Sequence, residues 1–186
     1  MKTGLGTTVH YWSRGIRIYI ALAIALVTLE CWWWAAAGYA GSSLFAIRLE
    51  EVYAWISTGM LAAALLIGPS YKVFGRLPGK RLMFDARRML GVGAAWFALL
   101  HAAIVYRSLF HFASPFGLPV NYQRSFLIAA LALLILFALA ATSFDGAIRK
   151  MGIWWFRLHR LIYIAVLLSL LHIFLSGAHA ASQTVI

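Results

Sequence analysis

The stretch RRMLGVGAAWFALLHAAIVY, residues 87–106, decides the fold class of this chain. The basic pair Arg87 and Arg88 is followed by eighteen residues without a single Lys, Arg, Asp or Glu. A helix that crosses a membrane needs roughly 20 mainly apolar residues. We therefore predict that this stretch spans a membrane and that His101 lies inside it.

Four further apolar runs of similar length complete a predicted bundle of five spanning helices. The five lie at about 16–34, 52–70, 89–107, 125–142 and 159–176. None shows the short alternating pattern of a membrane β-barrel. We predict an all-α integral membrane protein in which residues 1–186 form one domain.

Composition supports this class and excludes others. The chain is 63% hydrophobic and 11% charged, with a mean hydropathy of +0.85. A soluble domain is about 45–50% apolar and about 25% charged, so a soluble enzyme, a disordered tail and a coiled coil are excluded. Five spans in 186 residues leave no room for a nucleotide-binding domain, so flavin or nicotinamide chemistry is expected on another polypeptide. A single cysteine, Cys31, excludes an internal disulfide and a cysteine-ligated cluster.

The net charge of +11 is explained by membrane topology. Lys and Arg collect in cytoplasmic segments. The smaller set, expected outside, is Arg48, Arg107 and Arg124. The thirteen expected inside are Lys2, Arg14, Arg17, Lys72, Arg76, Lys80, Arg81, Arg87, Arg88, Arg149, Lys150, Arg157 and Arg160. We predict a cytoplasmic N-terminus, an external C-terminus and contact with lipid head groups, and we see no signal for nucleic-acid binding.

Two histidines lie deep in apolar runs, and such residues usually mark function. His101 lies 13 residues beyond Arg88, and His172 lies 13 residues beyond His159. Each interval is about 20 Å along a helix, and both helices run in the same direction, so the two imidazoles are expected at one depth in the outer half of the membrane. Imidazole is a standard axial ligand of haem iron, so a haem b held between His101 and His172 is the favoured interpretation. The alternative is that each histidine makes an interhelical hydrogen bond.

His159 is expected near the cytoplasmic surface, where its role stays open. The position at the same depth on the third helix is Arg87, which is not a histidine. On an ideal helix His159 and His172 point about 140° apart. They share a face only if the last helix is distorted or begins after His159. His159 is therefore a ligand of a second haem, an interfacial polar residue, or a hydrogen-bonding partner of a haem propionate.

Other residues carry weaker signals. Arg87, Arg88, Arg157 and Arg160 could pair with haem propionates or a quinol head group, and lipid phosphate is the competing partner. Small residues at Gly59, Gly91 and Gly93 are expected to allow close helix approach. Met60 and Met89 are either packing residues or iron ligands. Thr142, Ser143 and Asp145 are expected to form a helix cap or a turn.

Three stretches resemble the ferric reductase-like transmembrane domain of ferric reductases and NADPH oxidases. They are STGMLAAALLIGPSY (57–71), RRMLGVGAAWFALLHAAIVY (87–106) and ALAATSFDGAIRKMGIWWFRLHRLIYIAVLLSLLH (138–172). Within that family the chain resembles the haem-bearing membrane subunit of bacterial periplasmic methionine sulfoxide reductase systems. The resemblance implies a haem b bundle in the bacterial inner membrane, with ligation by His101, His159 and His172 and a basic pair at Arg87 and Arg88. The chain departs from the larger family members, which have two histidines on each of two helices and a flavin and nicotinamide domain.

The expected function is that of a membrane-embedded b-type cytochrome, the haem subunit of an oxidoreductase system and not an enzyme alone. It would take electrons from a cytoplasmic-side quinol or flavoprotein and pass them to a partner protein at the outer face. The alternative is a haem-bearing or purely structural accessory subunit of a larger respiratory or photosynthetic complex. A transporter or scaffold is a third class, which predicts a colourless purified protein.

Overall fold

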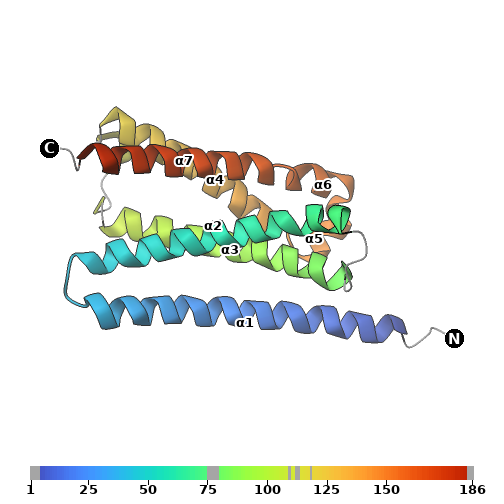
Figure 1. Cartoon of the computed structure of the whole chain (residues 1–186). Helices are drawn as coiled ribbons and strands as arrows, with labels where there is room; N and C mark the ends of the chain where they lie inside the picture. The colour runs from blue at the N-terminus through green and yellow to red at the C-terminus, as the bar shows by residue number, and fades with distance from the viewer. Residues whose placement is uncertain (1–4, 75–79, 109, 112–113, 118, 184–186) are drawn as a thin grey trace. The chain divides into compact units, whose positions relative to one another are not determined.

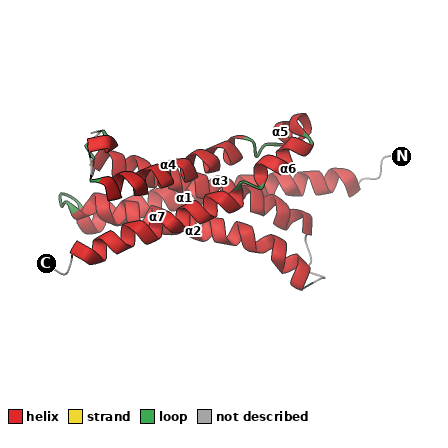
Figure 2. Cartoon of the chain, turned by 90° about the horizontal axis from the view of Figure 1, so that it is seen from above, coloured by secondary structure: helices red, strands yellow, loops and turns green. Residues whose placement is uncertain are grey.

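The structure is a computed structural model that describes the backbone of residues 5–74, 80–108, 110–111, 114–117 and 119–183. These residues form helices and connecting turns, with no strand among them (Figures 1 and 2). The elements are α1 (Leu5–Tyr39), α2 (Leu44–Val73), α3 (Lys80–Ser108), the 3₁₀ turn η1 (Pro115–Gly117), α4 (Val120–Ala141), α5 (Asp145–Met151), α6 (Ile153–His159) and α7 (Ile162–Gln183).

Five stretches of the described chain are long and apolar enough to cross a membrane. They are Gly15–Tyr39, Leu44–Val73, Leu82–Ser108, Tyr122–Ala141 and Ile153–Ser176. The prediction of an all-α bundle with five spanning helices is confirmed. Most of these stretches extend beyond the apolar runs, because the helical hydrogen bonds continue into polar residues that hydropathy does not count.

The chain divides into two compact units, Met1–His101 and Ala102–Ile186. In the first unit α1, α2 and α3 alternate in direction. Tyr53 on α2 donates a hydrogen bond to the carbonyl of Thr28 on α1 (3.0 Å). Ser57 on α2 donates to the carbonyl of Ala94 on α3 (2.8 Å), and Trp96 on α3 donates to the hydroxyl of Thr28 (3.1 Å).

The pairs between α1 and α3 keep one register, which shows that these two helices are parallel. Arg17 pairs with Asp85, and Thr28 pairs with Trp96; both pairs are 68 residues apart in sequence. The start of α1, the end of α2 and the start of α3 therefore lie at one end of this unit. Four cations lie at that end: Arg17, Lys72, Arg87 and Arg88. Lys2 and Arg76 and the side chains of Arg14, Lys80 and Arg81 lie outside the described residues.

Gly93 is the most closely packed of the described glycines of the first unit. A Cβ built on Gly93 would lie 2.8 Å from Ile24 Cδ1 and 3.1 Å from Met60 Sδ. The absence of a side chain there lets α3 approach α1 and α2, as predicted for small residues in membrane helices. Met60 is thus a packing residue. Among the described residues a Cβ at Gly59 or Gly91 would meet no atom within 4 Å, so the prediction of close approach was wrong for these two.

In the second unit α4 and α7 pack antiparallel along their lengths. Ser125, near the start of α4, contacts His172 and Ser176, near the end of the spanning part of α7. The hydroxyls of Thr142 and Ser143 donate to carbonyls of the last turn of α4, those of Ala138 and Leu139. The predicted cap is therefore at the end of α4, and α5 begins just after it.

The helical structure from α5 to α7 is interrupted at two places. Gly152, with φ of 53°, separates α5 from α6 in a backbone conformation that suits glycine. The indole of Trp155 on α6 donates to the carbonyl of Thr142 (2.9 Å), which holds α6 against the end of α4. At Arg160 and Leu161 the hydrogen bonds tighten to three-residue spacing, from Leu161 N to Leu158 O (2.9 Å) and from Tyr163 N to Arg160 O (3.2 Å), and α6 ends there.

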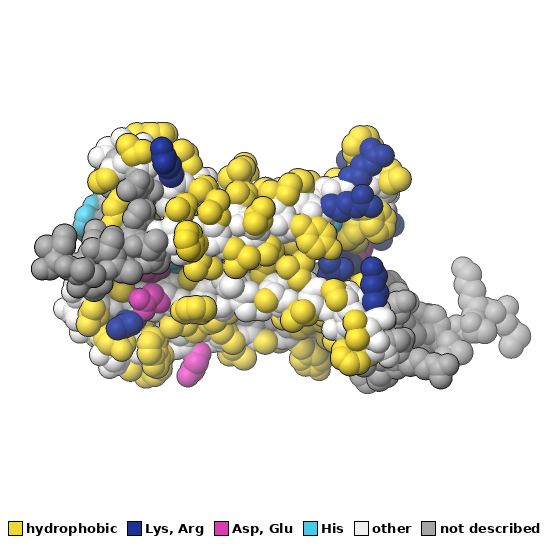
Figure 3. All heavy atoms as spheres, turned by 45° about the horizontal axis from the view of Figure 1, so that its top comes forward, with side chains coloured by type: hydrophobic (Ala, Val, Ile, Leu, Met, Phe, Trp, Pro, Cys, Tyr) yellow, Lys and Arg dark blue, Asp and Glu magenta, His cyan; other side chains and the backbone are white. Residues whose placement is uncertain are grey.

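Apolar side chains cover the outside of the helices, as expected where lipid replaces water. Leu22, Leu26, Trp33 and Leu134 are among the many large apolar residues that are exposed. In Figure 3 hydrophobic side chains lie along the helices, and Lys and Arg gather towards their ends. The protein is a multi-pass membrane protein.

Candidate functional site

The three histidines of the spanning segments share one hydrogen-bonding arrangement. Nδ1 of His101 lies 3.1 Å from the carbonyl oxygen of Glu50. Nδ1 of His172 lies 3.2 Å from the carbonyl oxygen of Ser125, and Nδ1 of His159 lies 3.1 Å from the carbonyl oxygen of Trp155. A carbonyl oxygen only accepts, so Nδ1 is the donor in each case. In a neutral imidazole Nε2 then carries the lone pair, which is the form that binds a metal.

His101 is the last residue of the first unit, and its Nδ1 contacts Glu50 of α2. Besides the contact with the Glu50 carbonyl, its Nδ1 lies 2.8 Å from Oε2 of the Glu50 side chain. The Glu50 and His101 side chains are 16% and 24% exposed. Glu50 was absent from the sequence prediction. A signal for it exists, because Glu50, Tyr53 and Ser57 recur at helical spacing and so share the face of α2 that packs on α3.

His172 lies in the second unit and contacts the neutral hydroxyl and carbonyl groups of Ser125. The Ser125 hydroxyl is 3.0 Å from Nδ1 of His172 and 3.1 Å from the Ser176 hydroxyl. Ser125 is buried, at 5% exposure. The serine therefore ties the imidazole to α4 and to the next turn of α7, without a formal charge.

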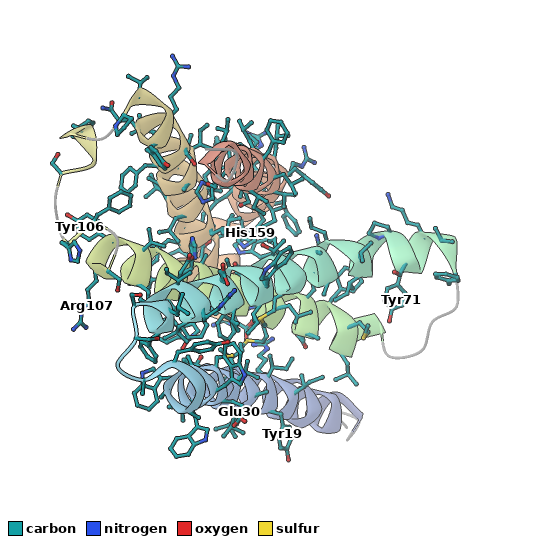
Figure 4. All side chains as sticks on the ribbon, turned by 60° about the vertical axis from the view of Figure 1, so that its left-hand side comes forward. Tyr19, Glu30, Tyr71, Tyr106, Arg107 and His159 are labelled. Carbon is teal, nitrogen blue, oxygen red and sulfur yellow. The ribbon has the colours of Figure 1, made fainter. Side chains whose placement is uncertain are left out.

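His159, which is labelled in Figure 4, is the last residue of α6 and stacks on the indole of Trp155. Its ring lies 3.8 Å from the Trp155 ring at 24°, and its Nε2 is buried. The helix is interrupted directly after His159, before α7 begins at Ile162. The last helix is thus distorted between His159 and His172, which is the condition that the sequence analysis set for the two histidines to share a face.

Each of the two deeper histidines lies a similar distance inside its own unit. His101 pairs with Glu50, six residues after α2 begins at Leu44, and His172 pairs with Ser125, five residues after α4 begins at Val120. At 1.5 Å per residue these offsets are about 9 and about 8 Å. His159 lies 13 residues before His172, about 20 Å along the chain direction.

The predicted arginines fall into two groups. In the first unit Asp85 Oδ1 lies 2.8 Å from Arg17 and 3.8 Å from Arg88, so a buried carboxylate that sequence reasoning missed balances part of the charge. Arg87 Nη1 approaches Gly68 of α2, 3.9 Å from where a Cβ would be. In the second unit Arg160 is exposed at the α6–α7 interruption.

The donor set of the described residues suits haem better than a protein-only metal centre. Among those residues no group of three or more His, Cys, Asp or Glu side chains converges. Haem iron takes its four equatorial nitrogens from the porphyrin and needs only axial ligands from the protein. Single neutral imidazoles with a fixed tautomer meet that need.

Comparison with known proteins agrees with this chemistry. A family model described as "Ferric reductase like transmembrane component" matches residues 53–170. The chain belongs to this ferric reductase-like transmembrane family. The matched segment includes His101 and His159 and ends two residues before His172.

Curated relatives show similarity over the same region. The protein-methionine-sulfoxide reductase heme-binding subunit MsrQ of Pasteurella multocida is 33% identical over 132 residues, which are 70% of this chain and 64% of the relative. MsrQ of Cronobacter sakazakii is 34% identical over 61% of this chain and 56% of its own length. The magnetosome protein MamZ of Magnetospirillum gryphiswaldense is 34% identical over 62% of this chain and 18% of its own length. The matches thus span little more than half of these MsrQ relatives, and no solved structure matches.

Proposed function

We propose that this protein is a b-type haem subunit that transfers electrons across the bacterial inner membrane. The observation that carries the proposal is the common arrangement of its membrane histidines, each with Nδ1 donating to a backbone carbonyl and Nε2 left as the ligating nitrogen. The names of the relatives agree, because the MsrQ proteins are called heme-binding subunits.

His101 and His172 are the proposed axial ligands of one haem b. The support for this pairing is the equal depth expected from the residue count, since each histidine lies 13 residues beyond a polar residue at the cytoplasmic end of its helix. When bound, the haem supplies a one-electron carrier whose potential depends on its axial ligands and burial. Arg87, Arg88 and Arg160 lie about 20 Å along their helices from these two histidines, at the cytoplasmic ends of the helices, and are proposed to bind a quinone head group or the propionates of a second, inner haem.

His159 is the proposed ligand of a second haem, nearer the cytoplasmic face. Its Nδ1 donates to a carbonyl as in the other two histidines, and its ring is fixed by stacking on Trp155. The corresponding position on α3 is Arg87, so the other axial ligand is not a histidine of that helix.

The proposed direction runs from a cytoplasmic quinol or flavoprotein to an acceptor at the outer face. The asymmetry of Lys and Arg supports this orientation, with the N-terminus inside and the C-terminus outside. The proposed acceptor is a reductase protein, since the MsrQ relatives are named as subunits of a protein-methionine-sulfoxide reductase.

The ligand assignment is tested by optical spectroscopy of detergent-purified protein with a pyridine haemochrome assay. His101→Ala and His172→Ala should each abolish or strongly alter the low-spin reduced spectrum. The matched control is His111→Ala, because His111 is exposed and outside the spanning segments. Normal spectra and full haem content in both membrane variants would contradict the assignment.

Haem stoichiometry tests the second site. If His159 binds a second haem, the wild-type ratio of haem to polypeptide is near two and falls to near one in His159→Ala. A ratio near one that this variant leaves unchanged removes the second haem.

Orientation is tested with reporter fusions at Gly79 and Ile186, two positions outside the described residues. They should report opposite sides of the membrane, with Gly79 on the cytoplasmic side. Finding both on one side would overturn the direction of transfer and the argument from equal depth.

A further inference from the structure

We propose that Glu50 is a positioning residue that sets the reduction potential of the haem bound through His101. The proposal rests on the haem function above and adds a residue that the family comparison does not identify, because Glu50 precedes the matched segment 53–170. It starts from the paired contact of one imidazole nitrogen with both the carbonyl and the carboxylate of Glu50.

The geometry fits a carboxylate that holds a ligating imidazole. Oε2 of Glu50 lies 2.8 Å from Nδ1 of His101, within the range of charge-assisted hydrogen bonds. Because the backbone carbonyl of the same residue also accepts from Nδ1, the proton stays on that nitrogen, and the ring is fixed in one tautomer and one orientation. Nε2 is then directed away from Glu50, on the opposite side of the ring.

The position of Glu50 shows that it is not an ordinary surface carboxylate in contact with water. Its side chain is only 16% exposed and lies within the spanning segment Leu44–Val73. Ionisable groups inside a span are costly and are usually paired for a function. The neighbouring Glu51 shows the other behaviour: its side chain is 44% exposed and pairs with Arg48 at 2.9 Å on the surface of the same helix.

The two deeper histidines differ in the charge of their partners. His101 has an anionic partner, whereas Ser125, the partner of His172, offers a hydroxyl and a carbonyl. A carboxylate that accepts from Nδ1 increases the basicity of the imidazole and so its donation to iron. Stronger donation and the nearby negative charge both favour ferric over ferrous iron. Glu50 is therefore expected to lower the potential of this haem and to make it a stronger reductant.

The experiment compares Glu50→Gln with Glu51→Gln in the full chain, purified in detergent. The glutamine amide oxygen still accepts from Nδ1, so Glu50→Gln removes the charge and keeps the hydrogen bond. Charge-assisted hydrogen bonds are roughly twice as strong as neutral ones, and changes in such outer partners alter metal binding by about 10–100-fold. We expect Glu50→Gln to shift the ferric/ferrous equilibrium about tenfold towards ferrous iron, or about 59 mV for one electron.

The readouts are a spectroelectrochemical titration and the low-spin ferric EPR spectrum, neither of which is an activity. A higher midpoint potential in Glu50→Gln, an unchanged one in Glu51→Gln and a return towards the wild-type value in Glu50→Asp support the proposal. If Glu50→Gln protein is helical and monodisperse but has lost its haem, while Glu51→Gln and Glu50→Asp keep theirs, the positioning role is also supported.

Three results would overturn the inference. The first is an unchanged potential and EPR spectrum in Glu50→Gln. The second is an equal shift in both glutamine variants, which would reduce the effect to surface charge. The third is aggregation of Glu50→Gln together with a wild-type potential in a folded Glu50→Ala, which lacks the carboxylate and would show that the residue is only structural. A wild-type protein that binds no haem would instead refute the proposed function, so the two failures are distinguishable.

Discussion

Enlarging Gly93 should destabilise the three-helix unit in proportion to the volume added. An alanine Cβ would lie 2.8 Å from Ile24 Cδ1, whereas carbon atoms pack best at about 3.5–4.0 Å. That side chain must therefore retreat by about 0.7 Å or more, and the flexible Met60 must also move. Overpacking costs about 1–3 kcal/mol, and replacing a mid-helix glycine with alanine returns about 1 kcal/mol. We expect Gly93→Ala to lower the free energy of unfolding by about 0–2 kcal/mol, and Gly93→Leu to lower it by about 3 kcal/mol.

The assay is unfolding in mixed micelles of increasing SDS content, followed by far-UV circular dichroism. Gly91→Ala is the matched control, since a Cβ at Gly91 meets no described atom within 4 Å, and it should be neutral or stabilising by about 1 kcal/mol. Adding Met60→Ala to Gly93→Leu should recover part of the loss by making room. Wild-type stability in Gly93→Leu, or an equal loss in Gly91→Ala, would refute the packing argument.

Two other contacts of the first unit yield predictions for the same assay. Arg17→Gln and Asp85→Asn should be non-additive, with a coupling of about 1–3 kcal/mol, because their 2.8 Å ion pair is largely buried; additive effects would show that the pair contributes nothing. Ser57→Ala removes the buried hydrogen bond to the Ala94 carbonyl and should cost about 1 kcal/mol. An unchanged midpoint in Ser57→Ala would show that the α2–α3 contact does not depend on this bond.

Hydropathy was sufficient to predict the five spans, because lipid forces every spanning segment to be an apolar helix. It also identified His101 and His172, since an imidazole inside an apolar run stands out in the sequence. Pairwise contacts between helices could not be predicted in the same way. Helical spacing places Glu50, and not the adjacent Glu51, on the face of α2 that carries Tyr53 and Ser57, but only the packing of α2 on α3 shows that Glu50 meets His101.

The packing at the glycines shows the same limit. Gly91 and Gly93 are two residues apart on one helix, so their side-chain positions lie on different faces. Only Gly93 meets Ile24 and Met60. A sequence rule for small residues treats the two alike, because it contains no information about which face has a neighbour.

The position of the interruption at Arg160 and Leu161 could not be predicted from the sequence either, because neither residue is a proline or a glycine. Its consequence concerns how the two histidines of this region are set. The azimuth of His159 follows from Trp155 and the end of α4, whereas the azimuth of His172 follows from the α4–α7 seam. In a continuous helix the two histidines would keep a fixed angle about the helix axis, so a rotation of the helix would move both rings together. Because the helix is interrupted between them, substitutions around one imidazole can change the orientation of that ring without rotating the other.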